Sequence, residues 1–145
     1  MPQIKVLIFQ KFNKGKMKIE KKLGIWMDHS IAHIIEFTDQ WNELKTIQSN
    51  FTHLDKVESL IKSEALMHNK EQKLQADFYK KLEDTILKYD DILLFGATNA
   101  KTELFNKMQK DHRFANVKIT VKEADKMTNT QKIFFISDYF ETVKT

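Results

Sequence analysis

The chain has 145 residues, 41% of them hydrophobic and 30% charged, which is typical of one globular domain. It contains no cysteine, three glycines and one proline. The lack of cysteine excludes a disulfide framework, a cysteine-ligated zinc site and a thiol nucleophile in this chain. The scarcity of glycine excludes a glycine-rich phosphate-binding loop.

The positive charge is concentrated near the amino terminus. The formal net charge is +4, but residues 1–22 hold seven lysines and one glutamate, so the rest of the chain carries a net charge of −2. Overall charge therefore gives no evidence of a nucleic-acid-binding surface on the folded part. We expect residues 1–16 to be a basic appendage and residues 17–145 to form a single domain, with either Met1 or Met17 as the native start.

The first half of the domain has the pattern of a three-stranded meander. The apolar run 23–27 predicts a strand buried on both faces, and a tight turn at Asp28 leads into a second strand over 31–37. Alternating residues over 43–48 predict a half-exposed third strand. Residues 51–69 have only weak helical spacing. Every apolar run is far shorter than the roughly 18 residues of a membrane span, so we expect a cytoplasmic protein without a membrane partner.

Helices and strands alternate in the second half. Apolar residues at every fourth position predict a helix over 70–89, followed by a strand over 91–95, a helix over 99–111 and a strand over 117–121. Thr128 and Gln131 form a capping-box pattern that begins a last helix. Its expected buried face consists of Ile133, Phe134, Ser137 and Phe140. The order β-β-β-α-β-α-β-α predicts an α/β fold with a mixed sheet, as in the ribonuclease H-like architecture.

Asp28 is the candidate for a catalytic or metal-binding carboxylate. A two-metal nuclease needs several carboxylates around two Mg²⁺ ions, but the predicted fourth strand ends at 96–98 without one. We therefore predict that Asp28 is a turn residue that caps its own backbone. His29 and His33 lack the spacing of metal ligands, so the sequence predicts no metal, no cofactor and no small-molecule substrate. A metal-dependent hydrolase or nuclease remains an alternative.

Three segments carry a more specific pattern. They are residues 23–35 (LGIWMDHSIAHII), residues 93–104 (LLFGATNAKTEL) and residues 123–128 (EADKMT). Together and in this order they resemble the middle domain of the archaeal and eukaryotic class-1 peptide-release factors and their Pelota relatives. The resemblance is closer to small bacterial proteins, described as translational machinery components, that retain little besides this domain. It covers roughly residues 22–142.

The resemblance does not extend to the catalytic motif. In the release factors, the loop before the long helix carries Gly-Gly-Gln, which positions water at the peptidyl-tRNA ester. The corresponding residues 51–73 contain no glycine here, and Gln72 follows Lys70 and Glu71. Because glycine is needed for that backbone shape, peptide release is not implied.

What the resemblance implies is a non-enzymatic protein that binds the ribosome or ribosomal RNA, in dormancy or rescue. Lys101, Lys126 and Asn99 match motif positions and are candidates for contacts with RNA. For Lys101 the alternative is a solvated position in the first turn of a helix. A different alternative for the whole chain is a protein-interaction module, unrelated to ribosomes, that uses residues 51–69. The sequence does not fix the oligomeric state.

Overall fold

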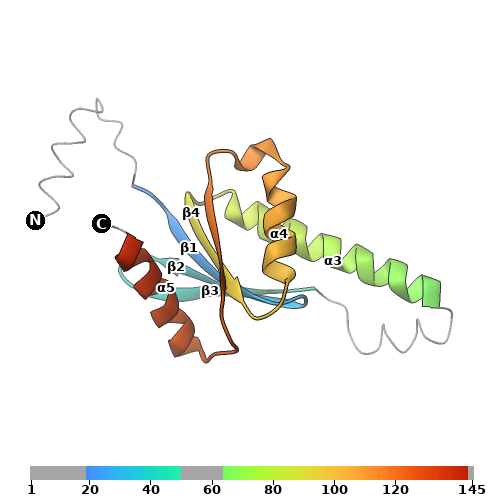
Figure 1. The fold of residues 1–145 in the computed structure, drawn as a ribbon, viewed down its shortest axis with the longest axis horizontal. Helices are drawn as coiled ribbons and strands as arrows, with labels where there is room; N and C mark the ends of the chain where they lie inside the picture. The colour runs from blue at the N-terminus through green and yellow to red at the C-terminus, as the bar shows by residue number, and fades with distance from the viewer. Residues whose placement is uncertain (1–18, 50–63, 144–145) are drawn as a thin grey trace, which may run out of the picture.

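The computed structural model of the protein describes residues 19–49 and 64–143. In this part of the chain a five-stranded mixed sheet carries helices on both faces (Figure 1). The elements are β1 (Lys22–Met27), β2 (Ile31–Phe37), β3 (Trp41–Gln48), α3 (Glu64–Ile86), β4 (Asp91–Gly96), α4 (Ala100–Gln109), the 3-10 helix η1 (His112–Phe114), β5 (Lys118–Glu123) and α5 (Asn129–Val143). The predicted basic appendage 1–16 and most of the predicted interaction segment 51–69 lie outside the described residues.

The strands follow the order β3-β2-β1-β4-β5 across the sheet. β1 pairs with β2, and β2 with β3, in antiparallel fashion, while β1 pairs with β4, and β4 with β5, in parallel. The carboxyl ends of β1 and β4 therefore lie at the same end of the sheet. From there the chain continues from β1 to its neighbour β2 on one side, and from β4 through α4 to β5 on the other. The mixed α/β class is confirmed, while assignment to the ribonuclease H-like architecture stays a prediction.

Two hydrophobic clusters lie on opposite faces of the sheet. α3 and α4 cover one face, where Leu82 and Leu104 pack with Ile25 of β1. α5 covers the other, where Ile136 packs with Trp26 of β1. Since successive strand residues point to opposite faces, both covered, the continuous apolar run of β1 is buried throughout, as predicted. No helix in the described ranges is long and apolar enough to span a membrane.

The last helix begins as predicted, and Ile133 and Phe140 of its expected buried face pack in the core, but Phe134 does not. The backbone N–H of Thr128 donates to Gln131 Oε1 at 2.8 Å, and the backbone N–H of Gln131 donates to Thr128 Oγ1 at 3.2 Å, which completes the capping box. Phe134, expected in the core, is 68% exposed, and Ile136 takes the buried position. The reason lies in β1, because a Cβ atom at Gly24 would be 2.3 Å from Ile136 Cδ1. Because Gly24 has no side chain, the side chain of Ile136 can pack directly on the backbone of β1.

The long helix α3 extends further toward the amino terminus than its apolar pattern indicates. It begins at Glu64, six residues before the predicted start, and ends at Ile86. Its buried residues Phe78, Leu82 and Ile86 pack on the sheet, whereas the described residues before Leu74 are mostly exposed. Residues 68–73 of α3, which are all polar, therefore lie beyond the stripe that packs on the sheet.

Candidate functional site

Asp28 builds the turn that leads from β1 into β2. Its Oδ1 atom accepts hydrogen bonds from the backbone N–H groups of Ser30 at 2.8 Å and Ile31 at 2.9 Å, and from Ser30 Oγ at 3.1 Å. These are the bonds expected of an aspartate that caps its own turn. In residues 19–49 and 64–143, no three histidine, aspartate or glutamate side chains lie close enough together to hold a metal ion. Within the described ranges, Asp28 therefore has no carboxylate cluster around it of the kind that two-metal catalysis needs.

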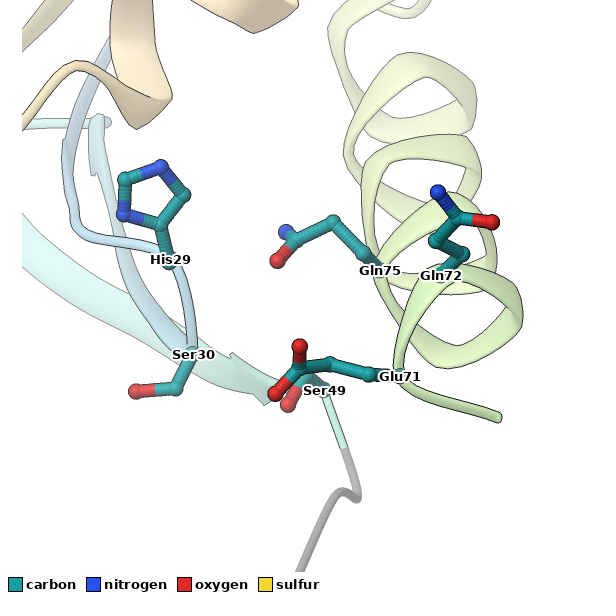
Figure 2. Close-up of a pocket in the computed structure, with 6 residues that line it drawn as sticks. All are labelled: His29, Ser30, Ser49, Glu71, Gln72 and Gln75. Atoms are coloured by element: carbon teal, nitrogen blue, oxygen red, sulfur yellow. The ribbon is translucent and has the colours of Figure 1, made fainter. Parts of the chain in front are cut away.

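A pocket of about 440 Å³ opens beside this turn, between the turn and the amino-terminal half of α3 (Figure 2). The described residues that line it are His29, Ser30, Ser49, Glu71, Gln72 and Gln75. It lies beyond the carboxyl ends of β1 and β3, on the antiparallel side of the sheet, and no described residue of β4 or of the β4–α4 connection lines it.

One wall of the pocket is held by a carboxylate of α4. Glu103 Oε1 accepts a hydrogen bond from the Tyr79 hydroxyl of α3 at 2.7 Å and lies 3.4 Å from His29 Nε2. Burial, together with the hydrogen bond and the charge of Glu103, raises the pKa of Tyr79, so its hydroxyl remains a donor at neutral pH. Glu103 of α4 is therefore hydrogen-bonded to α3 and lies close to the β1–β2 turn, where the side chains of His29 and Glu103 are about half exposed.

The opposite wall consists of polar side chains of α3. Glu71 and Gln75 extend from the helix toward the β1–β2 turn, whereas Gln72 points elsewhere (Figure 2), with its Nε2 atom 3.1 Å from His68 Nε2. The Nε2 atom of Gln75 is buried and has no hydrogen-bond partner in the described part of the chain. Sequence reasoning missed Gln75. Its signal is that it continues the buried stripe of Phe78 at helical spacing, toward the amino terminus of α3.

The end of β4 requires glycine. Gly96 has φ of 153°, and a Cβ atom there would lie 2.3 Å from the carbonyl oxygen of Met27 at the end of β1. The residues after Gly96 therefore turn closely past β1 into α4. Ala124, which follows β5, donates its backbone N–H to the Gly96 carbonyl at 3.1 Å. The β4–α4 and β5–α5 connections therefore lie side by side at the end of the sheet where β4 and β5 finish.

Lys101 is buried, contrary to the solvated position that was its alternative. Only 1% of its side chain is exposed, and its ammonium group donates to the Thr98 carbonyl at 2.6 Å and pairs with Glu123 Oε2 at 3.0 Å. Its polar contacts are thus made within the chain, where it ties the β4–α4 connection to the end of β5. This placement argues against the RNA contact predicted for Lys101.

Asn99 and Lys126 remain at the surface. Asn99 occupies the N-cap position of α4, where its side chain makes no capping hydrogen bond. Lys126 is exposed in the connection between β5 and α5. The structure therefore leaves two of the three predicted contact residues accessible, on neighbouring connections, and removes the third.

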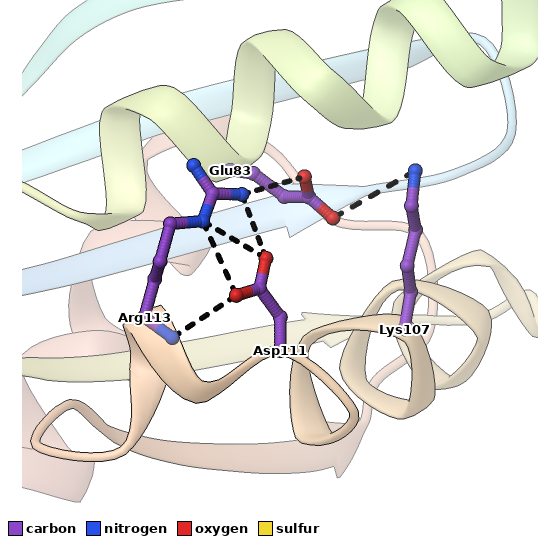
Figure 3. Close-up of polar contacts among 4 residues, drawn as sticks. All are labelled: Glu83, Lys107, Asp111 and Arg113. Atoms are coloured by element: carbon purple, nitrogen blue, oxygen red, sulfur yellow. Dashed lines mark hydrogen bonds and ion pairs between the residues drawn. The ribbon is translucent and has the colours of Figure 1, made fainter.

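A charged network joins α3 to α4 and η1 (Figure 3). The buried carboxylate of Glu83 lies 3.8 Å from Lys107 Nζ and 3.9 Å from an Arg113 guanidinium nitrogen. Arg113 also binds Asp111 through its guanidinium and its backbone N–H. The side-chain and backbone hydrogen bonds of Arg113 lower the pKa of Asp111 to about 2. The single arginine of the chain is therefore committed to this network rather than free for a bidentate phosphate contact.

Comparison with known proteins gives similarity in structure only. No family model and no curated protein matches the chain. The Pelota protein of Archaeoglobus fulgidus superposes on 96% of the chain, with a TM-score of 0.57 and 7% sequence identity. The Pelota protein of Thermoplasma acidophilum superposes on 94%, with a TM-score of 0.53 and 14% identity. The chain covers 36% of each of these two proteins, so it shares the fold of about a third of a Pelota protein.

Proposed function

We propose that this protein is a non-enzymatic, translation-associated domain that binds the ribosome or ribosomal RNA, in rescue or dormancy. The observation that carries the proposal is the similarity to two Pelota structures over nearly the whole chain. The ordered sequence segments that resemble the release-factor and Pelota middle domain support it independently, and on this view the matched third of Pelota is that middle domain. The catalytic Gly-Gly-Gln is absent from the sequence, which favours binding over peptide release.

The proposed contact surface lies at the end of the sheet where the β4–α4 and β5–α5 connections meet. Lys126 contributes an exposed cation there, and the amide of Asn99 is not used for capping. A lysine and an amide are both suited to phosphate or sugar contacts, which position a protein on RNA without reading its sequence. Such contacts weaken as the salt concentration rises, because binding releases counterions.

The test is sedimentation of the purified full chain with purified ribosomal subunits over a series of salt concentrations. Lys126→Glu is compared with Lys88→Glu. Lys88 is also exposed, but it lies at the opposite end of the sheet, before β4, in a pocket with Lys21 and Tyr89. We expect Lys126→Glu to weaken binding several-fold and to reduce the salt slope by about 1, and Lys88→Glu to leave both unchanged. Equal effects of the two substitutions would refute the assignment of this end of the sheet.

A further inference from the structure

We propose that Lys101 is a positioning residue for the contact with ribosomal RNA. Its buried ammonium group holds the β4–α4 and β5–α5 connections in one arrangement, so that Asn99 on the first and Lys126 on the second form a single phosphate-binding surface. The inference rests on the proposed ribosome binding. It names a residue on which that binding depends, although Lys101 itself is too deeply buried to touch RNA.

The ammonium group of Lys101 bridges the two connections. It donates to the carbonyl oxygen of Thr98 in the β4–α4 connection at 2.6 Å, and it lies 3.0 Å from Oε2 of Glu123, the last residue of β5. A lysine ammonium has three donors and no acceptor, so one such group can bind an oxygen atom on each side. Since only 1% of the Lys101 side chain is exposed, the close packing of the interior holds this bridge in place.

Few other polar contacts join the two connections. One backbone hydrogen bond links them at the ends of β4 and β5. Beyond that bond, the pair between Lys101 and Glu123 is the only hydrogen bond or ion pair that joins residues 97–101 to residues 123–128, two segments that the structure describes completely. The ammonium of Lys101 is therefore the polar link that sets how these segments lie relative to each other.

The proposed contact residues lie beside the two ends of this bridge. Asn99 directly follows Thr98, and Lys126 comes three residues after Glu123, in a connection without helix or strand. RNA can bind the amide and the ammonium at the same time only if both are held at matching positions. Groups that are ordered before binding lose less conformational entropy when the complex forms. Loss of the bridge should therefore weaken RNA binding although it removes no direct contact.

Two carboxylates near Lys126 allow positioning to be separated from charge. Glu123 is 77% exposed, and Asp125 is also exposed. Replacing either residue by alanine removes one negative charge close to Lys126, which by charge alone would strengthen the attraction to phosphate. Of these two carboxylates, however, only that of Glu123 pairs with Lys101. A positioning role therefore predicts that the two substitutions have different effects.

The first test is sedimentation of full-chain variants with purified ribosomal subunits. We expect Glu123→Ala to weaken binding several-fold with little change in Tm, because an exposed partner adds little stability. Asp125→Ala should bind as well as the unsubstituted chain or better. Undiminished binding by Glu123→Ala, or an equal loss in both variants, would overturn the positioning role alone. If the unsubstituted chain does not bind the subunits, the proposed function fails and the positioning role with it.

The second test is a double-mutant cycle, measured by the same sedimentation. Lys101→Met removes the ammonium but keeps most of the buried stem, so we expect binding to fall several-fold in a chain that circular dichroism shows to be folded. Lys126→Glu should then weaken binding less than it does in the unsubstituted chain, because the two residues act on one surface. Lys107→Met is the matched control, since it removes another α4 ammonium that pairs with a carboxylate, that of Glu83, and should leave binding unchanged. An equal effect of Lys126→Glu in both backgrounds would contradict the positioning role.

Discussion

Replacing Lys101 tests whether this lysine is a buried structural cation or a surface contact. Lys101→Ala removes three methylene groups from the interior, worth about 0.8 kcal/mol each. It also removes a charged hydrogen bond to the Thr98 carbonyl, worth about 1.5–3 kcal/mol. The partner Glu123 is 77% exposed and stays hydrated when it loses the lysine, so the ion pair adds less than about 1 kcal/mol. We expect Lys101→Ala to lower the free energy of unfolding by about 4–5 kcal/mol.

Two further variants divide that loss into its parts. Lys101→Met keeps most of the buried stem and loses the hydrogen bond, so it should cost about 2 kcal/mol. Glu123→Gln should cost less than about 1 kcal/mol. Urea unfolding of the three variants, with unchanged m values, gives the comparison. A loss below about 1 kcal/mol for Lys101→Ala, accompanied by weaker binding to ribosomal subunits, would refute the structural role and restore the RNA contact.

Three other substitutions test the packing and the titrating groups. Gly24→Ala should lower the free energy of unfolding by about 1–3 kcal/mol in thermal unfolding, because the new Cβ meets Ile136. The same substitution should cost less in a chain that carries Ile136→Ala, and an equal cost in the two backgrounds would contradict the clash. Burial raises the pKa of Asp91 above its ordinary value of 3.8, so the fold favours the protonated form, and that contribution is lost as pH rises through the raised pKa. Asp91→Asn should therefore raise Tm at pH 7 but not at pH 3, and an unchanged Tm at pH 7 would contradict this. Burial and the hydrogen bond to Glu36 raise the pKa of Tyr89 to about 12, so its contribution to stability is present below pH 10 and lost as pH rises through 12. An ultraviolet titration in which Tyr89→Phe removes absorbance change near pH 10 would show this environment to be wrong.

Local pattern was sufficient where burial is continuous along the chain. The apolar runs of β1 and β4 are covered on both faces, so their hydrophobicity alone predicts strands. The capping box of α5 could also be predicted from the sequence, because both of its hydrogen bonds join Thr128 and Gln131, three residues apart. Such features depend on neighbours in sequence, and the structure confirms them.

Features that depend on residues far apart in the sequence could not be predicted from local patterns. A lysine in the first turn of a helix is ordinarily solvated, and Lys101 is buried because the end of β5, with Glu123, closes beside it. The pocket brings Gln75 of α3 opposite His29 of the β1–β2 turn, a pairing that only the tertiary fold creates. The sequence also did not predict that α3 begins at Glu64. Helix turns that extend beyond the end of the sheet do not pack on it, so they need no apolar stripe.

The most direct test of the central claim is sucrose-gradient sedimentation of the chain in growing and starved cells, at low and moderate salt. The full chain is compared with a variant in which Lys5, Lys11, Lys14, Lys16 and Lys18 are replaced by Gln, because these lysines alone would attract RNA. If the described domain carries the function, the variant sediments with ribosomal subunits at moderate salt. If the variant is absent from every ribosomal fraction in both conditions, the proposed translation-associated function is contradicted.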